Sequence, residues 1–207
     1  MFRQISPNML KTYEVCARKF YYRYVKNISM PSNDDIFVLG KNIHALASYY
    51  LNGENIDAME QSLSPKEIGF WNYLKNLEYL QYKVINTEYN LSFRFNDVYL
   101  GGRLDALVKN GEDIFILDYK TGSIPKNAKF DYQTIVYLLA VSKLYNTNNV
   151  TFIYIDLKNK LEEKIKLTEE LKIEYAQKLE DIIIKICLED IPIKKNNCNC
   201  EYSSICF

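Results

Sequence analysis

The middle of the chain predicts a β-hairpin with charged side chains at positions that a half-buried strand would fill with apolar ones. Asn110-Gly111 lies between two runs of alternating hydrophobic residues, and Asn-Gly in that setting is a strong hairpin signal. A loop centred on Gly111 and Glu112 would place Asp105 directly opposite Asp118. A two-residue Asn110-Gly111 loop would place the two acids on a diagonal. In either register, both carboxylates face the same side of the sheet.

Lys120 shares that face, because it follows Asp118 by two residues. Two carboxylates and an amine would then converge, and close carboxylates repel each other unless a cation lies between them. Hard oxygen ligands of this kind suit Mg²⁺ or Mn²⁺. Lys120 could orient or deprotonate an attacking water, or stabilise negative charge on a phosphate. The alternative is that the acids are solvated strand residues and that Lys120 forms a salt bridge to one of them.

The order of the expected elements predicts an α/β fold, with a mixed sheet flanked by helices. The chain has 207 residues, of which 48% are hydrophobic, so it can bury one sizeable core as a single domain, with room for a small lobe. The expected helices cover about 7–24, 34–51, 64–82, 132–145 and 168–188, and the expected strands cover about 86–96, 98–108, 113–120, 150–156 and 162–167.

Charge and hydropathy limit the partners that the chain can have. The formal net charge is zero, so any basic surface for nucleic acid must be local. No apolar run is long enough to span a bilayer, and the first residues lack the apolar core of a signal peptide. We therefore expect a cytoplasmic protein without a membrane partner.

Two predicted helices carry further candidate site residues. His44 is the only histidine, and small residues such as Gly40 and Ala47 share its helix face, so the helix could approach the sheet and add a nitrogen ligand. The alternative is a hydrogen-bonded structural histidine. Gln133 and Tyr137 share a face at i, i+4 spacing, where they could bond a metal-bound water, a phosphate or a base. Tyr137 could equally be a core residue.

The cysteines predict a second metal centre. Cys198, Cys200 and Cys206 cluster in a polar tail, and Cys16 lies near the other end of the chain. Four thiols of this kind suit a [4Fe–4S] cluster or, alternatively, Zn²⁺. In a reducing compartment an odd number of cysteines favours metal ligation over a disulfide framework. Ligation would join the two ends of the chain, although the thiols could also be unligated.

This joining predicts a cysteine-cluster lobe formed by about residues 1–30 together with about 190–207. The remaining thiol, Cys187, lies in an apolar run. We expect it to be buried and inert.

Taken together, these residues resemble the motifs of the PD-(D/E)XK nuclease superfamily, in its RecB-like branch with a cysteine-bound iron–sulfur cluster. That branch includes CRISPR-associated exonucleases of spacer acquisition and the nuclease domains of repair helicases. The resemblance extends over almost the full length, with one departure, since the family spacing Cys-x-x-Cys-x5-Cys is one residue shorter between Cys198 and Cys200. The matching motifs are the opening helix with Cys16, Gly40 to His44, Glu88 before the strand meander, Gly102-Arg103-Leu104-Asp105, Asp118-Tyr119-Lys120-Thr121-Gly122, and Gln133 to Tyr137.

The resemblance implies a restriction-endonuclease-like core over residues 1–207 and Mg²⁺- or Mn²⁺-dependent hydrolysis of DNA, as an exonuclease on single-stranded ends. It implies DNA as the partner, with CRISPR adaptation proteins or a repair helicase as further partners. The alternative function is a DNA-end-binding assembly subunit with secondary nuclease activity. The implied metal ligands are His44, Asp105, Asp118 and the Tyr119 carbonyl, the implied catalytic residues are Asp105, Asp118, Lys120, Gln133 and Tyr137, and the implied cluster ligands are Cys16, Cys198, Cys200 and Cys206.

Overall fold

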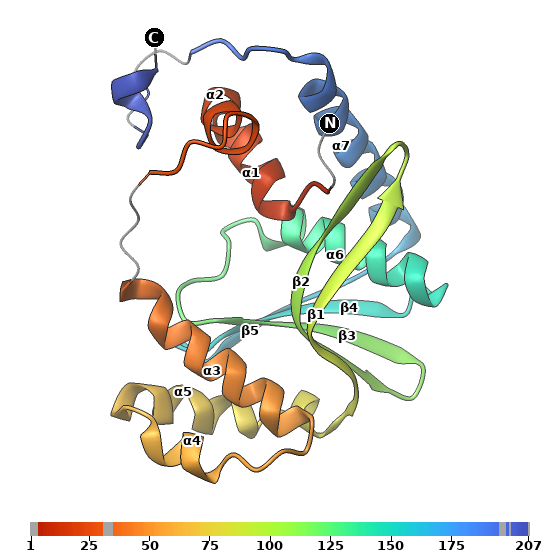
Figure 1. Ribbon diagram of the computed structural model, residues 1–207. Helices are drawn as coiled ribbons and strands as arrows, with labels where there is room; N and C mark the ends of the chain where they lie inside the picture. Colours follow the sequence, from red (N-terminus) through yellow and green to blue (C-terminus); the bar gives the residue numbers. More distant parts are fainter. Residues whose placement is uncertain (1–3, 31–34, 195–197, 199, 207) are drawn as a thin grey trace.

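The computed structural model describes residues 4–30, 35–194, 198 and 200–206. Its strands are β1 (Lys83–Phe95), β2 (Val98–Asn110), β3 (Asp113–Lys120), β4 (Val150–Asp156) and β5 (Leu161–Lys166). They form one sheet in the order β1-β2-β3-β4-β5 (Figure 1). β3 and β4 are parallel, and every other neighbouring pair is antiparallel. The predicted mixed sheet is therefore confirmed.

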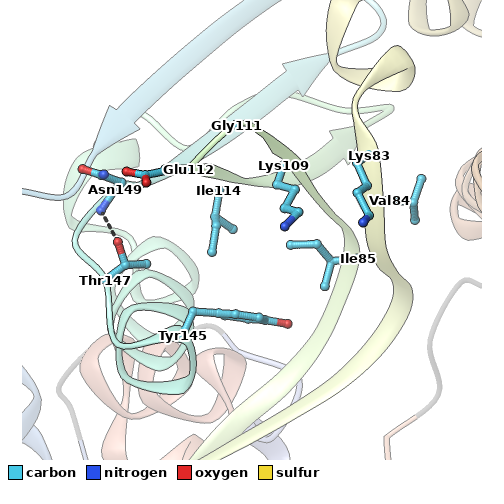
Figure 2. Close-up of a pocket in the computed structure, with 10 residues that line it drawn as sticks. All are labelled: Lys83, Val84, Ile85, Lys109, Gly111, Glu112, Ile114, Tyr145, Thr147 and Asn149. Atoms are coloured by element: carbon cyan, nitrogen blue, oxygen red, sulfur yellow. Dashed lines mark hydrogen bonds between the residues drawn. The ribbon is translucent and has the colours of Figure 1, made fainter.

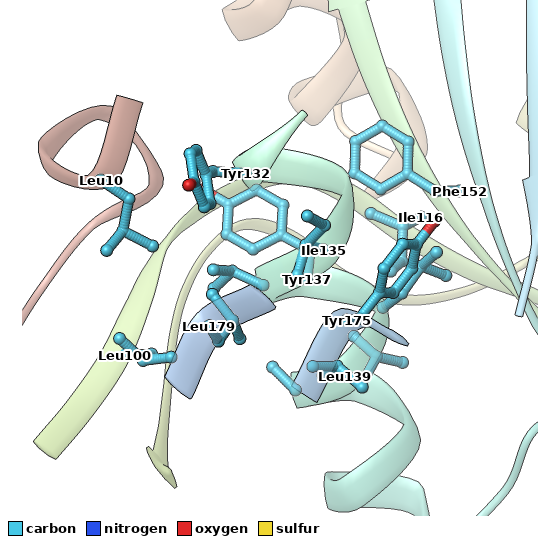
Figure 3. Close-up of a cluster of buried hydrophobic side chains, with 14 of the residues drawn as sticks. Leu10, Leu100, Ile116, Tyr132, Ile135, Tyr137, Leu139, Phe152, Tyr175 and Leu179 are labelled. Carbon is cyan, nitrogen blue, oxygen red and sulfur yellow. The ribbon is translucent and has the colours of Figure 1, made fainter. Parts of the chain in front are cut away.

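Helices cover both faces of this sheet. The α-helices are α1 (Pro7–Val15), α2 (Ala17–Phe20), α3 (Asp35–Leu51), α4 (Asp57–Ser62), α5 (Pro65–Lys75), α6 (Tyr132–Tyr145) and α7 (Glu169–Leu188). Leu117 on β3 packs in the core beneath α3 and α5. Its neighbour Ile116 points to the other face, because side chains alternate along a strand, and packs in the core beneath α1, α6 and α7 (Figure 3). No helix within the described residues is long and apolar enough to cross a bilayer.

The helix starts follow from the sequence. α1 begins with Pro7 after Ser6, and α5 begins with Pro65 after Ser64, as a serine cap followed by proline predicts. In α5, Glu67 completes a capping box with the main chain and hydroxyl of Ser64. The Glu67 carboxylate also accepts a hydrogen bond of 2.7 Å from Asn42, so this cap joins α5 to α3.

The predicted helix over 7–24 is broken, which corrects the expectation of one continuous helix. Cys16 has an extended backbone, with φ −159° and ψ 106°. Its N–H donates to the Thr12 carbonyl, which ends α1, and its thiol accepts the Lys19 N–H at 3.4 Å, which caps α2. A π-helical turn, Tyr21–Val25, follows α2. The chain therefore changes direction at the first of the predicted cluster ligands.

The helices differ from the sequence prediction in two further ways. The helix expected over 64–82 ends at Lys75 and is followed by a 3₁₀ turn, Glu78–Gln81. The short helix α4 was not expected, because its six residues bury no side chain and so carry no apolar period.

The β1–β2 hairpin separates from the rest of the sheet. β2 pairs with β3 only from Asn110, opposite Asp113, to Ala106, opposite Leu117, around the predicted Gly111-Glu112 loop. Beyond Ala106, the N-terminal segment takes the place of β3 beside β2, since Ile5 exchanges main-chain hydrogen bonds with Tyr99 and Gly101. The hairpin thus rises away from β3, as the yellow and green arrows of Figure 1 show. This separation opens the sheet at Asp105 and Asp118.

Candidate active site

The predicted site residues lie where β2 and β3 part. Their register is the one that places Asp105 opposite Asp118, although main-chain pairing ends one step earlier. The Asp105 carboxylate accepts the Tyr119 N–H at 2.8 Å. A side chain from β2 therefore occupies the position that a main-chain acceptor would have in a continuous ladder.

One group of side chains at this opening has the composition of a metal site. The ligand atoms of His44, Glu88 and Asp105 all lie within 4.8 Å of one another. α3 brings His44 to the sheet, as the small residues on that helix predict. Its Nδ1 lies 3.2 Å from Asp105, and its Nε2 lies 2.9 Å from the Tyr119 carbonyl oxygen. Burial lowers the pKa of His44, but the hydrogen bond and charge of Asp105 outweigh burial, and the net pKa is raised.

Glu88 is held in this group by its backbone and by an ion pair. It has φ +48° in the middle of β1, a left-handed conformation that is uncommon for residues other than glycine. Its carboxylate pairs with the guanidinium of Arg103 on the adjacent strand. Glu88 is absent from the metal ligands that the sequence predicts. The sequence signal that could have identified it is the resemblance to the nuclease family, in which an acid often occupies this position.

Asp118 lies in a second group, together with Lys120 and Gln133. The Lys120 ammonium lies 2.7 Å from the Asp118 carboxylate and donates to the Gln133 side-chain oxygen at 3.1 Å. The Gln133 amide donates to the other Asp118 oxygen. Burial raises the pKa of Asp118 to about 6, with Lys120 opposing and Asp105 adding to the rise. Lys120 thus forms the salt bridge that is the alternative to a predicted role at an attacking water or a phosphate.

Tyr137 contacts the backbone of β2 in this structure. It is 5% exposed, and its hydroxyl donates to the Arg103 carbonyl at 3.1 Å. A Cβ on Gly102 would lie 2.5 Å from that hydroxyl oxygen, so the absence of a side chain at this position allows α6 to approach β2. Tyr137 is therefore a core residue that also positions the strand of Arg103 and Asp105.

The two ends of the chain pack together away from this opening. The rings of Tyr22 and Tyr202 stack, with centroids 5.7 Å apart. The Tyr22 hydroxyl donates to the Ile205 carbonyl at 3.0 Å, and the Tyr202 hydroxyl donates to the Ile28 carbonyl at 2.8 Å. The described parts of the two segments that were predicted to form a lobe are thus in contact.

The thiols in this region are partly gathered. Cys16 and Cys206 are buried, and Cys198 and Cys200 are half-buried. Burial raises the pKa of Cys200, and Cys198 and Cys16 lie near enough to raise it further. Within the residues that the structure describes, no three thiol sulfurs lie within 4.8 Å of one another. Cys187 is exposed, which corrects the expectation of a buried thiol, because the buried side of α7 is formed by its neighbours.

Comparisons with known proteins identify the family and the fold of this chain. A family model described as the PD-(D/E)XK nuclease superfamily matches residues 4–207. The chain is 22% identical over 208 residues to the CRISPR-associated exonuclease Cas4 of Francisella tularensis subsp. novicida (strain U112), covering 98% of this chain and 93% of that protein. Its fold is similar to the crystal structure of a candidate exonuclease from Eubacterium rectale, with a TM-score of 0.62 and 12% identity over 96% of this chain and 86% of that chain. The chain belongs to the PD-(D/E)XK nuclease superfamily.

Proposed function

We propose that the protein is a Mg²⁺- or Mn²⁺-dependent deoxyribonuclease that hydrolyses DNA from a strand end. The convergence of His44, Glu88 and Asp105 carries this proposal. One imidazole and two carboxylates suit Mn²⁺, and they suit Mg²⁺ where waters complete its coordination. All three residues are half-buried, so a substrate can reach them while the protein fixes their positions.

The neighbouring groups fit the same chemistry. A divalent cation bound there would polarise a phosphodiester and lower the pKa of a bound water. The Tyr119 carbonyl lies beside His44, and we propose that it adds a ligand to the same cation. Asp118 lies opposite Asp105 in the register, and we propose that its carboxylate joins the ligand set when the cation binds. The Lys120 side chain is 27% exposed. Its ammonium can stabilise a phosphate or move a proton, while Gln133 fixes both Lys120 and Asp118.

Digestion of end-labelled DNA tests this site. We expect cleavage with Mn²⁺ or Mg²⁺ and none with EDTA. Asp118→Asn keeps the size of the side chain, and it should lower the rate at least about 100-fold, by analogy with the loss of a single transition-state contact. Asp113→Asn, on an exposed acid of the same strand, is the matched control and should retain the wild-type rate. Equal rates for the two variants would remove Asp118 from the catalytic group.

The proposed substrate is a DNA strand with a free end. Similarity to the CRISPR-associated exonuclease Cas4 over nearly the whole chain supports an exonuclease activity. We extend the proposal to single-stranded DNA ends as the substrate and to CRISPR adaptation proteins as partners. Substrates with a 5′ overhang, a 3′ overhang or blunt ends separate the strand preference and the polarity. Accumulation of internal fragments without loss of terminal nucleotides would contradict the exonuclease assignment.

We also propose that Cys16, Cys198, Cys200 and Cys206 hold a structural [4Fe–4S] cluster, with Zn²⁺ as the alternative. The contact between the two chain ends supports it, as does the position of Cys200 near Cys198 and Cys16. Such a group would join the lobe formed by about residues 1–30 and 190–207. It takes no part in the hydrolysis described above.

Metal content after anaerobic purification tests the cluster. The wild-type protein should be brown and contain about four irons per chain. Cys16→Ser should lose the iron yet keep its helix content, because serine can replace the thiol as the N-cap of α2. Cys187→Ser, on an exposed thiol, is the control and should keep the iron. A colourless protein that contains zinc would establish the alternative.

A further inference from the structure

Two cavities flank the loop between α6 and β4, far along the molecule from the candidate active site. Their volumes are about 550 and 570 Å³, and Thr147 lines both of them. Such volumes are typical of ligand sites. The cations that line them are Lys83 and Lys109 in the first cavity, and Arg94, Lys143 and Lys172 in the second.

The first cavity brings together two lysines that lack a counter-charge. Lys83 and Lys109 are partners in the β1–β2 register, and like charges directly opposite each other are destabilising. Figure 2 shows both amines on the same side of the cavity, with the ring of Tyr145 extending beneath them. In the described chain neither amine is paired with an acid. Glu112, the one acid that lines this cavity, lies on the other side of Ile114 in Figure 2.

The cations of the second cavity are held by neutral groups or by an exposed acid. Lys143 donates to the Arg94 carbonyl at 2.7 Å, and Lys172 donates to the Asn148 side-chain oxygen at 2.9 Å. Neither contact neutralises the positive charge. Arg94 pairs with Asp97 at 3.4 Å, with side chains that are 66% and 91% exposed, so solvent screens that pair. No acid lines this cavity.

This concentration of positive charge is local, because the formal net charge of the chain is zero. Two adjoining cavities with separate cations match an anion that carries several spaced phosphates. Phe93, Phe95 and Tyr145 also line them, and aromatic rings provide surfaces on which bases stack. We propose that this cationic end, defined by its five lysine and arginine residues, binds the phosphate backbone of the DNA strand whose terminus enters the active site. This inference rests on the proposed function.

The length of α6 sets the reach of such a strand. Gln133, in the active site, and Tyr145, beside the first cavity, lie about 18 Å apart along the helix at 1.5 Å per residue. A stacked strand advances about 3.4 Å per nucleotide, so about five nucleotides separate the two places. In this stacked form an oligonucleotide of four nucleotides spans only about 14 Å, which is shorter than the distance between the two places.

Binding and cleavage by the full chain, compared between variants, test the proposal. Two variants, Lys83→Gln/Lys109→Gln and Lys143→Gln/Lys172→Gln, each remove two charges from the cationic end. Lys66→Gln/Lys185→Gln removes two exposed lysines from α5 and α7 and is the matched control. Binding of labelled dT₂₀ is measured in EDTA, where hydrolysis plays no part. Each cationic-end variant should weaken binding at least fivefold at low salt, and should reduce the salt slope by about 0.7 for each phosphate that is no longer neutralised.

Cleavage of short and long strands with Mn²⁺ then separates this proposal from that of the active site. The cationic-end variants should raise the KM for dT₂₀ and leave the cleavage of dT₄ at the wild-type rate. If both cationic-end variants bind dT₂₀ as tightly as the control variant does, the proposal is overturned. It is also overturned if only one of the two variants binds more weakly, because the proposed surface includes both cavities. Loss of dT₄ cleavage would also overturn it, because the variants would then act on the catalytic group itself.

Discussion

Replacing Gly102 with alanine should strain the contact between α6 and β2 that positions the candidate active site. The new Cβ would lie 2.5 Å from the Tyr137 hydroxyl oxygen, and 3.3 and 3.4 Å from two ring carbons of that tyrosine. Tyr137 is 5% exposed, so the ring has little space into which to move. Overpacking of this kind costs about 1–3 kcal/mol, and we expect Gly102→Ala to lower the free energy of unfolding by that amount.

The double variant with Tyr137→Phe identifies the cause. Tyr137→Phe alone loses the hydrogen bond to the Arg103 carbonyl, which costs about 1 kcal/mol. In the double variant the hydroxyl is gone, so only the two tight ring contacts remain. Its loss of stability should therefore be smaller than the sum of the single losses, by about 0.5–2 kcal/mol, within the range seen for residues in contact.

Urea denaturation followed by circular dichroism measures these differences. Gly69→Ala is the control, since no atom lies within 4 Å of the added Cβ and the position is inside α5. It should raise the free energy of unfolding by about 0.5–1 kcal/mol, because alanine favours a helix. Nuclease activity should fall in Gly102→Ala and not in Gly69→Ala. Strictly additive losses, or a Gly102→Ala variant as stable as the wild type, would refute the steric argument.

Three further changes test other parts of the structure. Hydrogen bonds from Ser64 lower the pKa of Glu67, so Glu67→Gln should reduce the free energy of unfolding by about 1–2 kcal/mol at pH 7. Urea titrations at several pH values measure that difference in the free energy of unfolding. It should begin to shrink as the pH falls below about 4.3, the pKa of glutamate in the unfolded chain, and should be lost as the pH falls through the lower pKa of Glu67 in the folded protein. Glu88→Gln should raise the Mn²⁺ concentration for half-maximal cleavage about tenfold, whereas an unchanged value would remove Glu88 from the metal ligands. Tyr202→Leu loses the stack on Tyr22, so amide exchange should accelerate over residues 17–28 and stay unchanged in β3 and β4.

The parts of the fold that local pattern determines were predictable from the sequence. The Asn-Gly signal and the alternation around it predict the β2–β3 hairpin and leave two registers open, and the structure has the one with the Gly111-Glu112 loop, in which Asp105 faces Asp118. The bounds of β3, β4 and α6 coincide with those expected. Each of these elements is rich in apolar residues and is bounded by a cap or a turn, so local and tertiary preferences agree.

The remaining features depend on contacts between distant segments, which a local pattern does not contain. Cys16 leaves the helical conformation inside a sequence that is otherwise suited to a helix. Ile5 pairs with β2 only because β3 has turned away. The left-handed backbone of Glu88 could not be predicted from its residue type, because glutamate does not favour positive φ. These three departures lie at the lobe and at the candidate active site, where local rules are most often broken.

The opening of the sheet itself produces the candidate active site. The N–H and C=O of one strand residue point toward the same neighbouring strand, so those of Tyr119 would both pair with β2 in a continuous ladder. Because β2 has left, the N–H bonds the Asp105 carboxylate and the carbonyl accepts from His44. Two proposed metal ligands thus replace the missing strand, and the main chain of β3 fixes their positions. Any change that closes this gap would return Tyr119 to the ladder and release both side chains, so the separation of the strands is as necessary to the proposed nuclease as the acids are.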